Sequence, residues 1–328
     1  MKTVLIGCGV ISSTHTDVLL KLGREITAVC DIDYEKAKRH CEKFGLKCRI
    51  YQDYKEMLDK EQPDVAHVLT PHYLHCEMIV EILGRNINCL CEKPLYIKEN
   101  EYDLIKGAVE KSNATLGICF QHRYLKVNQY IKNAVENEGF AGASVMLAWH
   151  KDESYYKSGD WRGKFETEGG ALLINQAIHT LDQLCWIGGT PESICANLKT
   201  HTLADFIEAE DTAELFFEHK NGAVSQIFAT NSAIANFNGL TCLKTNVATY
   251  EYNSKYVYRN NKKVNIDDDS VDIDTKNYWG YGHYHLIKDY YFCIQSNKSF
   301  PIGFEEAAKA VKLVLGAYRS NGKPIEIK

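Results

Sequence analysis

Short apolar runs alternate with helical patterns along the first 120 residues of the chain. Runs rich in Val, Ile, Leu and Cys predict strands, and apolar positions three or four residues apart predict the helices between them. The predicted strands are 3–6, 26–30, 48–51, 65–69, 87–91 and 116–120, and the predicted helices are 10–22, 34–44, 74–83 and 99–110. Strands that alternate with helices of this length indicate a parallel sheet covered on both faces. We therefore predict a doubly wound α/β domain over residues 1–120.

The pattern changes after residue 120, where strands with two-residue alternation become frequent. Strands are expected at 143–150, 193–198, 213–218, 224–230, 240–250 and 255–259, and helices at 127–136, about 170–186, 284–295 and 304–318. A polar loop at 152–168 separates the first strand from the second helix, and the segment His219-Lys220-Asn221-Gly222 has the composition of a hairpin turn. The alternation and the turn predict a mainly antiparallel sheet in an α+β domain over residues 121–328.

Composition narrows the class of protein. The chain has 328 residues, 25% of them charged, a formal net charge of −5 and no apolar run near the roughly 20 residues that a membrane span needs. We therefore expect neither membrane insertion nor the basic surface that nucleic-acid binding requires. Many of the 12 cysteines lie in or beside apolar runs, and Met1-Lys2-Thr3 leads straight into a predicted strand with no signal peptide. A reduced, cytoplasmic protein is expected.

A glycine motif lies between the first predicted strand and the first predicted helix. The segment Gly7-Cys8-Gly9-Val10-Ile11-Ser12 has the form G-x-G-x-x-S. Its first glycine permits a tight turn, and its second allows a pyrophosphate to approach the helix N-terminus. Asp31 ends the second predicted strand, where a carboxylate can hold both hydroxyls of a ribose and would repel a 2′-phosphate. The motif indicates a site for NAD rather than NADP; a tight turn with a helix cap and no ligand is the alternative.

Three further motifs point to a family. Thr70-Pro71-His72-Tyr73-Leu74-His75 follows the fourth predicted strand, Cys91-Glu92-Lys93-Pro94-Leu95 follows the fifth, and residues 169–182 read GGALLINQAIHTLD. Together with the glycine motif, in this order, they resemble the Gfo/Idh/MocA family of NAD(P)-dependent oxidoreductases over essentially the whole chain. The resemblance implies an N-terminal Rossmann domain and a C-terminal domain with a large open sheet for substrate binding and oligomerisation. It also implies hydride transfer between nicotinamide and a hydroxyl-bearing carbon of a sugar, cyclitol or nucleotide sugar.

The resemblance implies roles for individual residues. Lys93 and His179 match the family's catalytic lysine and histidine, and together with Asn175 and Arg162 they would bind the substrate. The residues implied to contact the cofactor are Gly7, Gly9, Val10, Ile11, Asp31, Thr70, Pro71, His75, Glu92, Lys93, Gln121, Trp161 and Arg162. Asn175 stands where many members carry Asp; an amide cannot accept a proton as a carboxylate can, but it can hydrogen-bond a substrate hydroxyl. Asp182, three residues after His179, could orient the imidazole ring.

Less specific interpretations of these residues stay open. Lys93 alone fits a surface turn, and His179 alone fits a hydrogen-bonded histidine at a helix edge. His72 and His75 have the spacing of a metal pair, but a cofactor loop explains them better, and no metal is expected. An NAD-dependent glycoside hydrolase that uses transient oxidation, or a non-catalytic NAD-binding sensor, would have the same fold. The resemblance also implies a homodimer or homotetramer; the sequence leaves the substrate, the direction of reaction and the number of subunits undetermined.

Overall fold

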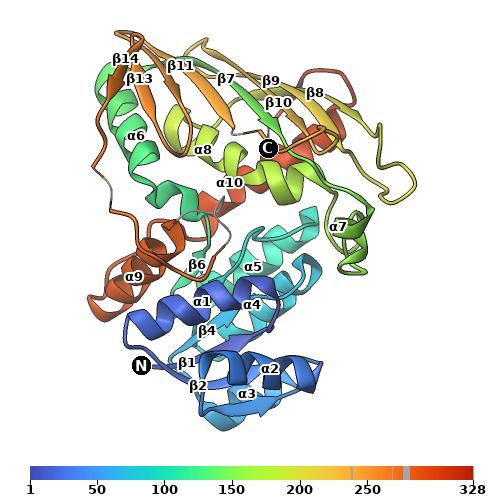
Figure 1. The fold of residues 1–328 in the computed structure, drawn as a ribbon, viewed down its shortest axis with the longest axis vertical. Coiled ribbons are helices and arrows are strands. Elements are labelled where there is room, and N and C mark those ends of the chain that lie inside the picture. The colour runs from blue at the N-terminus through green and yellow to red at the C-terminus, as the bar shows by residue number, and fades with distance from the viewer. Residues whose placement is uncertain (238, 268, 276–280, 328) are drawn as a thin grey trace. The chain divides into compact units, whose positions relative to one another are not determined.

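The computed structural model describes residues 1–237, 239–267, 269–275 and 281–327, and the chain divides into two compact units (Figure 1). Unit 1 comprises Met1–Tyr124 and Ser270–Ala307, and unit 2 comprises Leu125–Asp269 and Ala308–Lys328. The chain therefore leaves unit 1 and later returns to it. The predicted domain ranges, 1–120 and 121–328, stay a prediction.

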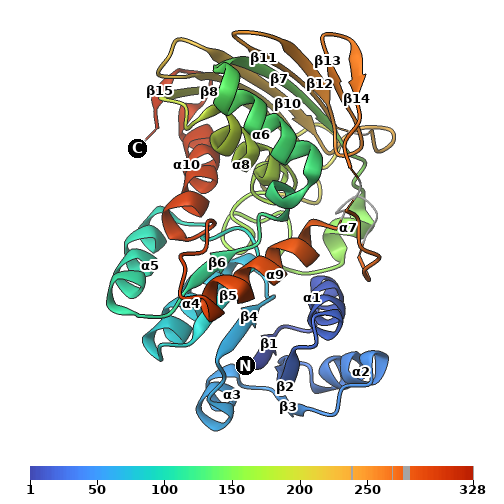
Figure 2. The same ribbon diagram turned by 90° about the vertical axis from the view of Figure 1, so that its left-hand side faces the viewer.

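Unit 1 is built on a six-stranded sheet in which every neighbouring pair of strands is parallel. The strands lie in the order β3-β2-β1-β4-β5-β6. They are β1 (Lys2–Ile6), β2 (Glu25–Cys30), β3 (Arg49–Tyr51), β4 (Val65–Val68), β5 (Asn88–Cys91) and β6 (Leu116–Ile118). The helices are α1 (Val10–Lys21), α2 (Tyr34–Phe44), α3 (Tyr54–Glu61), α4 (His75–Gly84), α5 (Glu99–Lys111) and α9 (Gly282–Gln295). Figure 2 shows the sheet between α1 and α2 on one side and α4 and α5 on the other, which confirms the doubly wound domain.

The sequence explains these elements locally. All four residues of β4 are buried, as expected for an apolar strand covered on both faces. Helix α2 begins where the Asp33 side chain accepts a hydrogen bond from the Lys36 backbone N–H, and it ends at Gly45 with φ of 63°. The segment Ser270–Ala307, which returns to unit 1, packs closely on the sheet. A Cβ on Gly117 of β6 would lie only 2.7 Å from the Tyr290 ring of α9. Helix α9 is therefore an integral part of unit 1.

Unit 2 is built on a nine-stranded sheet in the order β14-β13-β12-β11-β7-β10-β9-β8-β15. All neighbouring pairs in this sheet are antiparallel except β7 with β10. The strands are β7 (Phe140–Ala148), β8 (Ser193–Lys199), β9 (Thr212–Glu218), β10 (Val224–Thr230), β11 (Leu240–Thr245), β12 (Thr249–Tyr252), β13 (Val257–Arg259), β14 (Lys262–Val264) and β15 (Ile325–Glu326). The helices are α6 (Lys126–Glu138), α7 (Glu153–Lys157), α8 (Ile178–Gly188) and, from Ala308 onward, α10 (Phe304–Ser320). Figure 2 shows α6 and α8 against one face of the sheet. The predicted open, mainly antiparallel sheet is confirmed.

One predicted strand of unit 2 is wrong. The run 240–250 is two strands, β11 and β12, joined by a turn at residues 246–248. The Thr245 hydroxyl accepts hydrogen bonds from the backbone N–H groups of Val247 and Ala248 at 3.2 and 2.9 Å. This side chain closes the turn in place of the Gly or Pro that usually marks one.

Candidate active site

The glycine motif forms the turn between β1 and α1. Gly7 has a φ of 98°, and a Cβ at this position would lie 2.7 Å from the carbonyl oxygen of Leu69, so only glycine fits. Gly9 is the N-cap of α1, and a Cβ there would meet no atom within 4 Å. The backbone at the start of α1 is therefore open to a ligand, with Val10 exposed and Ile11 partly exposed in the first turn. This is the cradle that a pyrophosphate requires.

Asp31 ends β2 beside this turn. One of its carboxylate oxygens accepts a hydrogen bond from the Cys8 backbone N–H at 2.8 Å, and the other accepts one from the Asp33 N–H at 3.0 Å. The Lys36 ammonium lies 3.1 Å from the same carboxylate, a neighbour that the sequence pattern did not indicate. Because β1 separates β2 from β4 in the sheet, the turn and Asp31 lie where the strand order reverses, the usual place of dinucleotides in such sheets.

The loop after β4 is tied to the turn that carries Lys93. His75 is fully buried, with Nδ1 2.7 Å from the carbonyl oxygen of Pro94 and Nε2 3.0 Å from that of Thr70. Burial lowers the pKa of His75, although both carbonyl groups act in the opposite direction. In this structure His75 links two loops; the cofactor contacts of Thr70, Pro71 and His75 stay predictions.

Glu92 and Lys93 follow β5 and differ in exposure. Lys93 is partly exposed and is joined to Pro94 by a cis peptide bond. Glu92 is buried, and its Oε2 accepts a hydrogen bond from the Lys93 backbone N–H at 3.3 Å. The Glu92 carboxylate therefore anchors the backbone of Lys93 from inside the unit.

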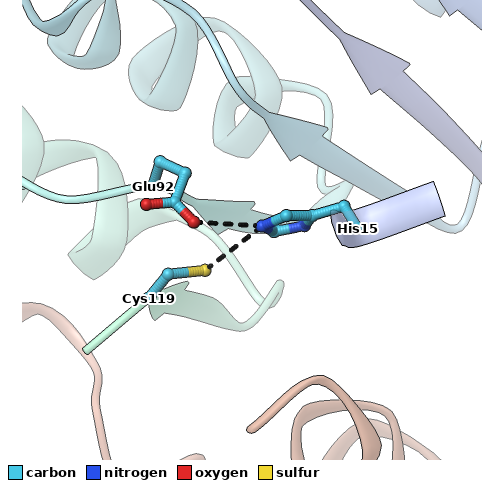
Figure 3. Close-up of side chains that lie close together, drawn as sticks. All are labelled: His15, Glu92 and Cys119. Atoms are coloured by element: carbon cyan, nitrogen blue, oxygen red, sulfur yellow. Dashed lines mark hydrogen bonds and ion pairs between the residues drawn. The ribbon is translucent and has the colours of Figure 1, made fainter. Parts of the chain in front are cut away.

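The buried His15 imidazole and Cys119 thiol lie beside Glu92 (Figure 3). Its Oε1 lies 3.0 Å from Nε2 of His15 and 3.2 Å from Nε2 of His283, and the Cys119 thiol lies 4.0 Å from the same His15 nitrogen. Burial alone would raise the pKa of Glu92, but the hydrogen bonds from His15 and His283 outweigh it and hold that pKa well below its usual value. Burial lowers the pKa of His15 and raises that of Cys119.

Gln121 lies in the short 3-10 turn Gln121–Tyr124 and is buried. Its side-chain oxygen has no hydrogen-bond partner within the part of the chain that the structure describes. The predicted contact of Gln121 with the cofactor stays a prediction.

In unit 2, the predicted polar loop is ordered around a buried acid, Glu168. The guanidinium carbon of Arg162 lies 4.5 Å from the ring centroids of both Trp161 and Tyr155, and Nη1 donates a hydrogen bond to the Tyr155 hydroxyl at 2.8 Å. Glu168 accepts a hydrogen bond from the Gly163 backbone N–H and lies 3.9 Å from the Arg162 guanidinium. The Arg162 guanidinium therefore packs against the Trp161 and Tyr155 rings, next to α7. The cofactor and substrate contacts of Trp161 and Arg162 stay predictions.

Asn175 belongs to the same cluster. Its side-chain amide donates hydrogen bonds to the Glu168 carboxylate and, at 3.2 Å, to the Tyr155 hydroxyl. Gln176 also donates to the Tyr155 hydroxyl, at 2.8 Å. A carboxylate at position 175 would face the buried Glu168 carboxylate, so the amide suits this surrounding.

The predicted α-helix from about residue 170 to 186 is wrong in its first part. Residues Leu172–Ala177 form a π-helical segment, and α8 begins at Ile178. The Glu210 carboxylate binds the start of this segment, because its Oε1 accepts a hydrogen bond from the Leu173 backbone N–H at 2.7 Å. Asn175 and His179 are consequently not related by regular α-helical spacing, and π segments are frequent at functional sites. His179 lies in the first turn of α8 and is partly exposed; its orientation by Asp182, which is buried, stays a prediction.

The Glu210 side chain itself is buried. Its Oε1 also accepts a hydrogen bond from the Tyr318 hydroxyl at 3.0 Å, and its Oε2 has no hydrogen-bond partner among the described residues. Burial raises the pKa of Glu210 to about 7, and the nearby Glu168 carboxylate adds to the increase. Sequence patterns gave no sign of Glu168 or Glu210, because acids in loops are normally solvated.

Two stretches of the chain match models of known protein families. Residues 1–120 match the family model "Oxidoreductase family, NAD-binding Rossmann fold", and residues 129–242 match "GFO/IDH/MocA C-terminal domain". The chain belongs to the Gfo/Idh/MocA family. This confirms the predicted family, its NAD-dependent oxidoreductase class and NAD as its cofactor. The glycine cradle and Asp31 fit that cofactor.

The individual relatives described next share only 24–27% sequence identity with this chain. Glucose-6-phosphate 3-dehydrogenase of Bacillus subtilis is 25% identical over 71% of this chain and 68% of the relative. Inositol 2-dehydrogenase of Salmonella typhimurium is 27% identical over 57% of this chain, which spans about half (54%) of that relative. The fold is similar to that of the WlbA dehydrogenase from Bordetella pertussis in complex with NADH and UDP-GlcNAcA, with a TM-score of 0.88 and 24% identity over 100% of this chain and 98% of that one. Among the described residues, no helix combines the length and the apolar character needed to cross a membrane.

Proposed function

We propose that this Gfo/Idh/MocA protein is an NAD-dependent dehydrogenase that acts on a hydroxyl-bearing carbon of a sugar, cyclitol or nucleotide sugar. The observation that carries the proposal is the polar cluster of unit 2, where amide and guanidinium groups gather beside the segment that bears His179. Such donors suit a substrate rich in hydroxyl groups. The relatives named for glucose 6-phosphate and inositol support the same substrate class.

The nucleotide would be held by the carboxyl ends of β1 and β2. The N–H groups at the start of α1 bind its pyrophosphate, Gly9 leaves room for that group, and Asp31 accepts hydrogen bonds from a ribose. NAD+ supplies a hydride acceptor when it is bound. The carboxylate of Asp31 favours NAD over NADP because it would repel a 2′-phosphate. The remaining predicted cofactor contacts, from the loop after β4 to Trp161, belong to this proposal.

Lys93 and His179 would carry the acid–base chemistry. Oxidation of an alcohol removes a proton from oxygen together with the hydride from carbon, so a positioned base must take that proton. We assign this proton transfer to Lys93, whose backbone the buried Glu92 anchors, with His179 as the second acid–base group. Asn175 and Arg162 would bind neighbouring substrate hydroxyls, and the Asn175 amide would donate a hydrogen bond rather than take a proton.

The test follows the nicotinamide absorbance of purified protein with NAD+ and a panel of sugars, inositols and nucleotide sugars. Lys93→Ala and His179→Ala should each lower turnover by about 10²–10⁴-fold, the usual contribution of a general acid or base. NADH affinity, measured by fluorescence, should stay within about twofold, since these groups act on the substrate. The exposed residues Lys111 and His201 provide matched alanine controls. Turnover that survives both substitutions would refute the assignment, and glycoside cleavage without net reduction would favour the hydrolase alternative.

A homodimer or homotetramer is also proposed. The open face of the nine-stranded sheet exposes Met146, Phe216, Val224 and Phe228, each at 39% or more. Apolar side chains gathered on one sheet face favour an interface with a second copy. Light scattering on the purified protein would test it: a monomeric mass at micromolar concentration would argue against the proposal. The predicted cytoplasmic location stays a prediction.

A further inference from the structure

Three side chains of the types that bind transition metals converge in the interior of unit 1. His15 comes from α1, Glu92 follows β5, and Cys119 follows β6. Their potential ligand atoms, Nε2, a carboxylate oxygen and Sγ, all lie within 4.8 Å of one another, and all three residues are buried. Figure 3 shows the carboxylate and the thiol pointing toward the His15 ring.

The spacing of these atoms approaches that of a tetrahedral metal centre. Zinc binds nitrogen and oxygen at about 2.0–2.2 Å and sulfur at about 2.3 Å, which places N and O about 3.3 Å apart and N and S about 3.6 Å apart. The His15 Nε2 to Glu92 Oε1 distance is 3.0 Å, and the His15 Nε2 to Cys119 Sγ distance is 4.0 Å. Both lie within about half an ångström of the zinc values. Two of the three distances between the ligand atoms therefore approach those of a zinc centre, and the third, between Glu92 and Cys119, is at most 4.8 Å.

The second nitrogen of His15 also has a hydrogen-bond partner, which is another buried imidazole. Its Nδ1 lies 2.8 Å from Nδ1 of His67, and Nε2 of His67 lies 3.1 Å from the Tyr291 hydroxyl. The Tyr291 hydroxyl lies 2.7 Å from the hydroxyl of Thr3, so the chain of hydrogen bonds runs on into β1. A cation requires the tautomer in which His15 carries its proton on Nδ1 and donates it along this chain, because this tautomer leaves the Nε2 lone pair free for the ion. Such outer hydrogen bonds fix the tautomer and the ring orientation of a metal-binding histidine.

The carboxylate is supported in the same way. His283, at the start of α9, places Nε2 3.2 Å from the Glu92 oxygen that faces His15. This contact helps to orient the oxygen that would bind the ion. A divalent cation there would also balance the charge of a buried carboxylate, which is costly when left uncompensated.

We propose that unit 1 binds one Zn²⁺ through His15 Nε2, Glu92 Oε1 and Cys119 Sγ. The mixed nitrogen, oxygen and sulfur donors favour zinc over the hard cations Mg²⁺ and Ca²⁺. On binding, the Cys119 thiol releases its proton to solvent as the Zn–S bond forms, and a water molecule completes the tetrahedron. The ion would join α1 to the carboxyl ends of β5 and β6, directly behind Lys93. This proposal is independent of the substrate and of the proton-transfer roles given above.

The experiment uses Co²⁺ as a spectroscopic probe of the full-length protein. Protein treated with a chelator is titrated with CoCl₂, and one equivalent should produce a thiolate-to-cobalt charge-transfer band together with the visible bands of tetrahedral Co²⁺. Stoichiometric ZnCl₂ should abolish both sets of bands. Cys119→Ser should remove the charge-transfer band, whereas Cys89→Ser, which changes a fully buried cysteine of β5 outside the cluster, should retain it.

Wild-type protein alone provides a second measurement, in case the Cys119→Ser variant fails to fold. X-ray absorption of the zinc-loaded protein should show one sulfur scatterer among nitrogen and oxygen scatterers. Absence of a charge-transfer band in the wild type, its persistence in folded Cys119→Ser, or a zinc shell without sulfur would each overturn the proposal. The cluster would then be a network of hydrogen bonds in which His15 donates its Nε2 proton to Glu92.

Discussion

The buried carboxyl of Glu210 makes the stability of unit 2 depend on pH in an unusual direction. Burial raises its pKa from 4.5 to about 7, so the folded protein binds more protons than the unfolded chain between these two values. The free energy of unfolding should therefore fall as pH rises through this interval and level off above it. At 1.36 kcal/mol for each pKa unit, the full effect is about 3 kcal/mol.

Replacement of Glu210 by Gln tests this reasoning. The amide keeps an oxygen for the Leu173 N–H and the Tyr318 hydroxyl, and it cannot ionise. We expect Glu210→Gln and the wild type to have equal free energies of unfolding at about pH 4.5. At about pH 8 the free energy of unfolding of Glu210→Gln should be higher by up to about 3 kcal/mol. The wild type should lose stability over the same interval.

The measurement is urea unfolding followed by tryptophan fluorescence at a series of pH values. Three of the four tryptophans, Trp149, Trp161 and Trp186, belong to unit 2 and report on its unfolding. Glu214→Gln, on the exposed face of β9, is the matched control and should show no pH-dependent difference. A difference between Glu210→Gln and wild type that stays constant with pH would refute the reasoning.

Three further predictions concern the glycine turn, Asp31 and the polar cluster of unit 2. Gly7→Ala should lower the free energy of unfolding by about 1–3 kcal/mol, because position 7 combines a positive φ with a close carbonyl oxygen, whereas Gly9→Ala should fold normally and bind NADH more weakly. Melting temperatures and NADH fluorescence titrations measure the two effects. Equal stability of the two variants would contradict this prediction. Asp31→Asn should lower the preference for NADH over NADPH by about tenfold in binding titrations, since it removes a charge that repels a 2′-phosphate. Asn175→Asp should lower the melting temperature at neutral pH by placing two carboxylates in contact, and Glu168→Gln in the same chain should restore it. A melting temperature unchanged by Asn175→Asp would show that the two groups are not in contact.

Most of unit 1 could be predicted because its signals are local. Continuous apolar runs mark strands buried on both faces, and Asp33 and Gly45 mark the two ends of α2. The glycine turn could be recognised in the same way, since Gly7, Gly9 and Asp31 all lie within one strand–helix–strand unit. These features follow from short-range stereochemistry and hydrogen bonding, which the sequence displays directly.

The features that the sequence did not reveal depend on contacts between distant segments. The apolar spacing of Leu172–Ala177 is that of an ordinary helix, whereas the segment is π-helical and its Leu173 N–H is bound by the distant Glu210 carboxylate. In the same way, the cluster around Glu92 draws His15, Cys119 and His283 from separate elements, at no spacing that a motif would describe. Tertiary contacts of this kind override local preference.

The return of the chain to unit 1 has a consequence for the order of events during translation. Tyr290 packs on β6, and the Tyr291 hydroxyl is hydrogen-bonded to the Thr3 hydroxyl in β1. Both tyrosines belong to α9, which follows β14 in the chain and precedes only β15 of the unit 2 strands. About 180 residues separate Tyr124 from the end of that segment at Ala307. At about 5–20 residues per second, a ribosome needs roughly 10–40 s to synthesise them. Throughout that interval the nascent nucleotide-binding sheet lacks α9. The surface that α9 covers in the folded protein therefore stays exposed unless a chaperone covers it.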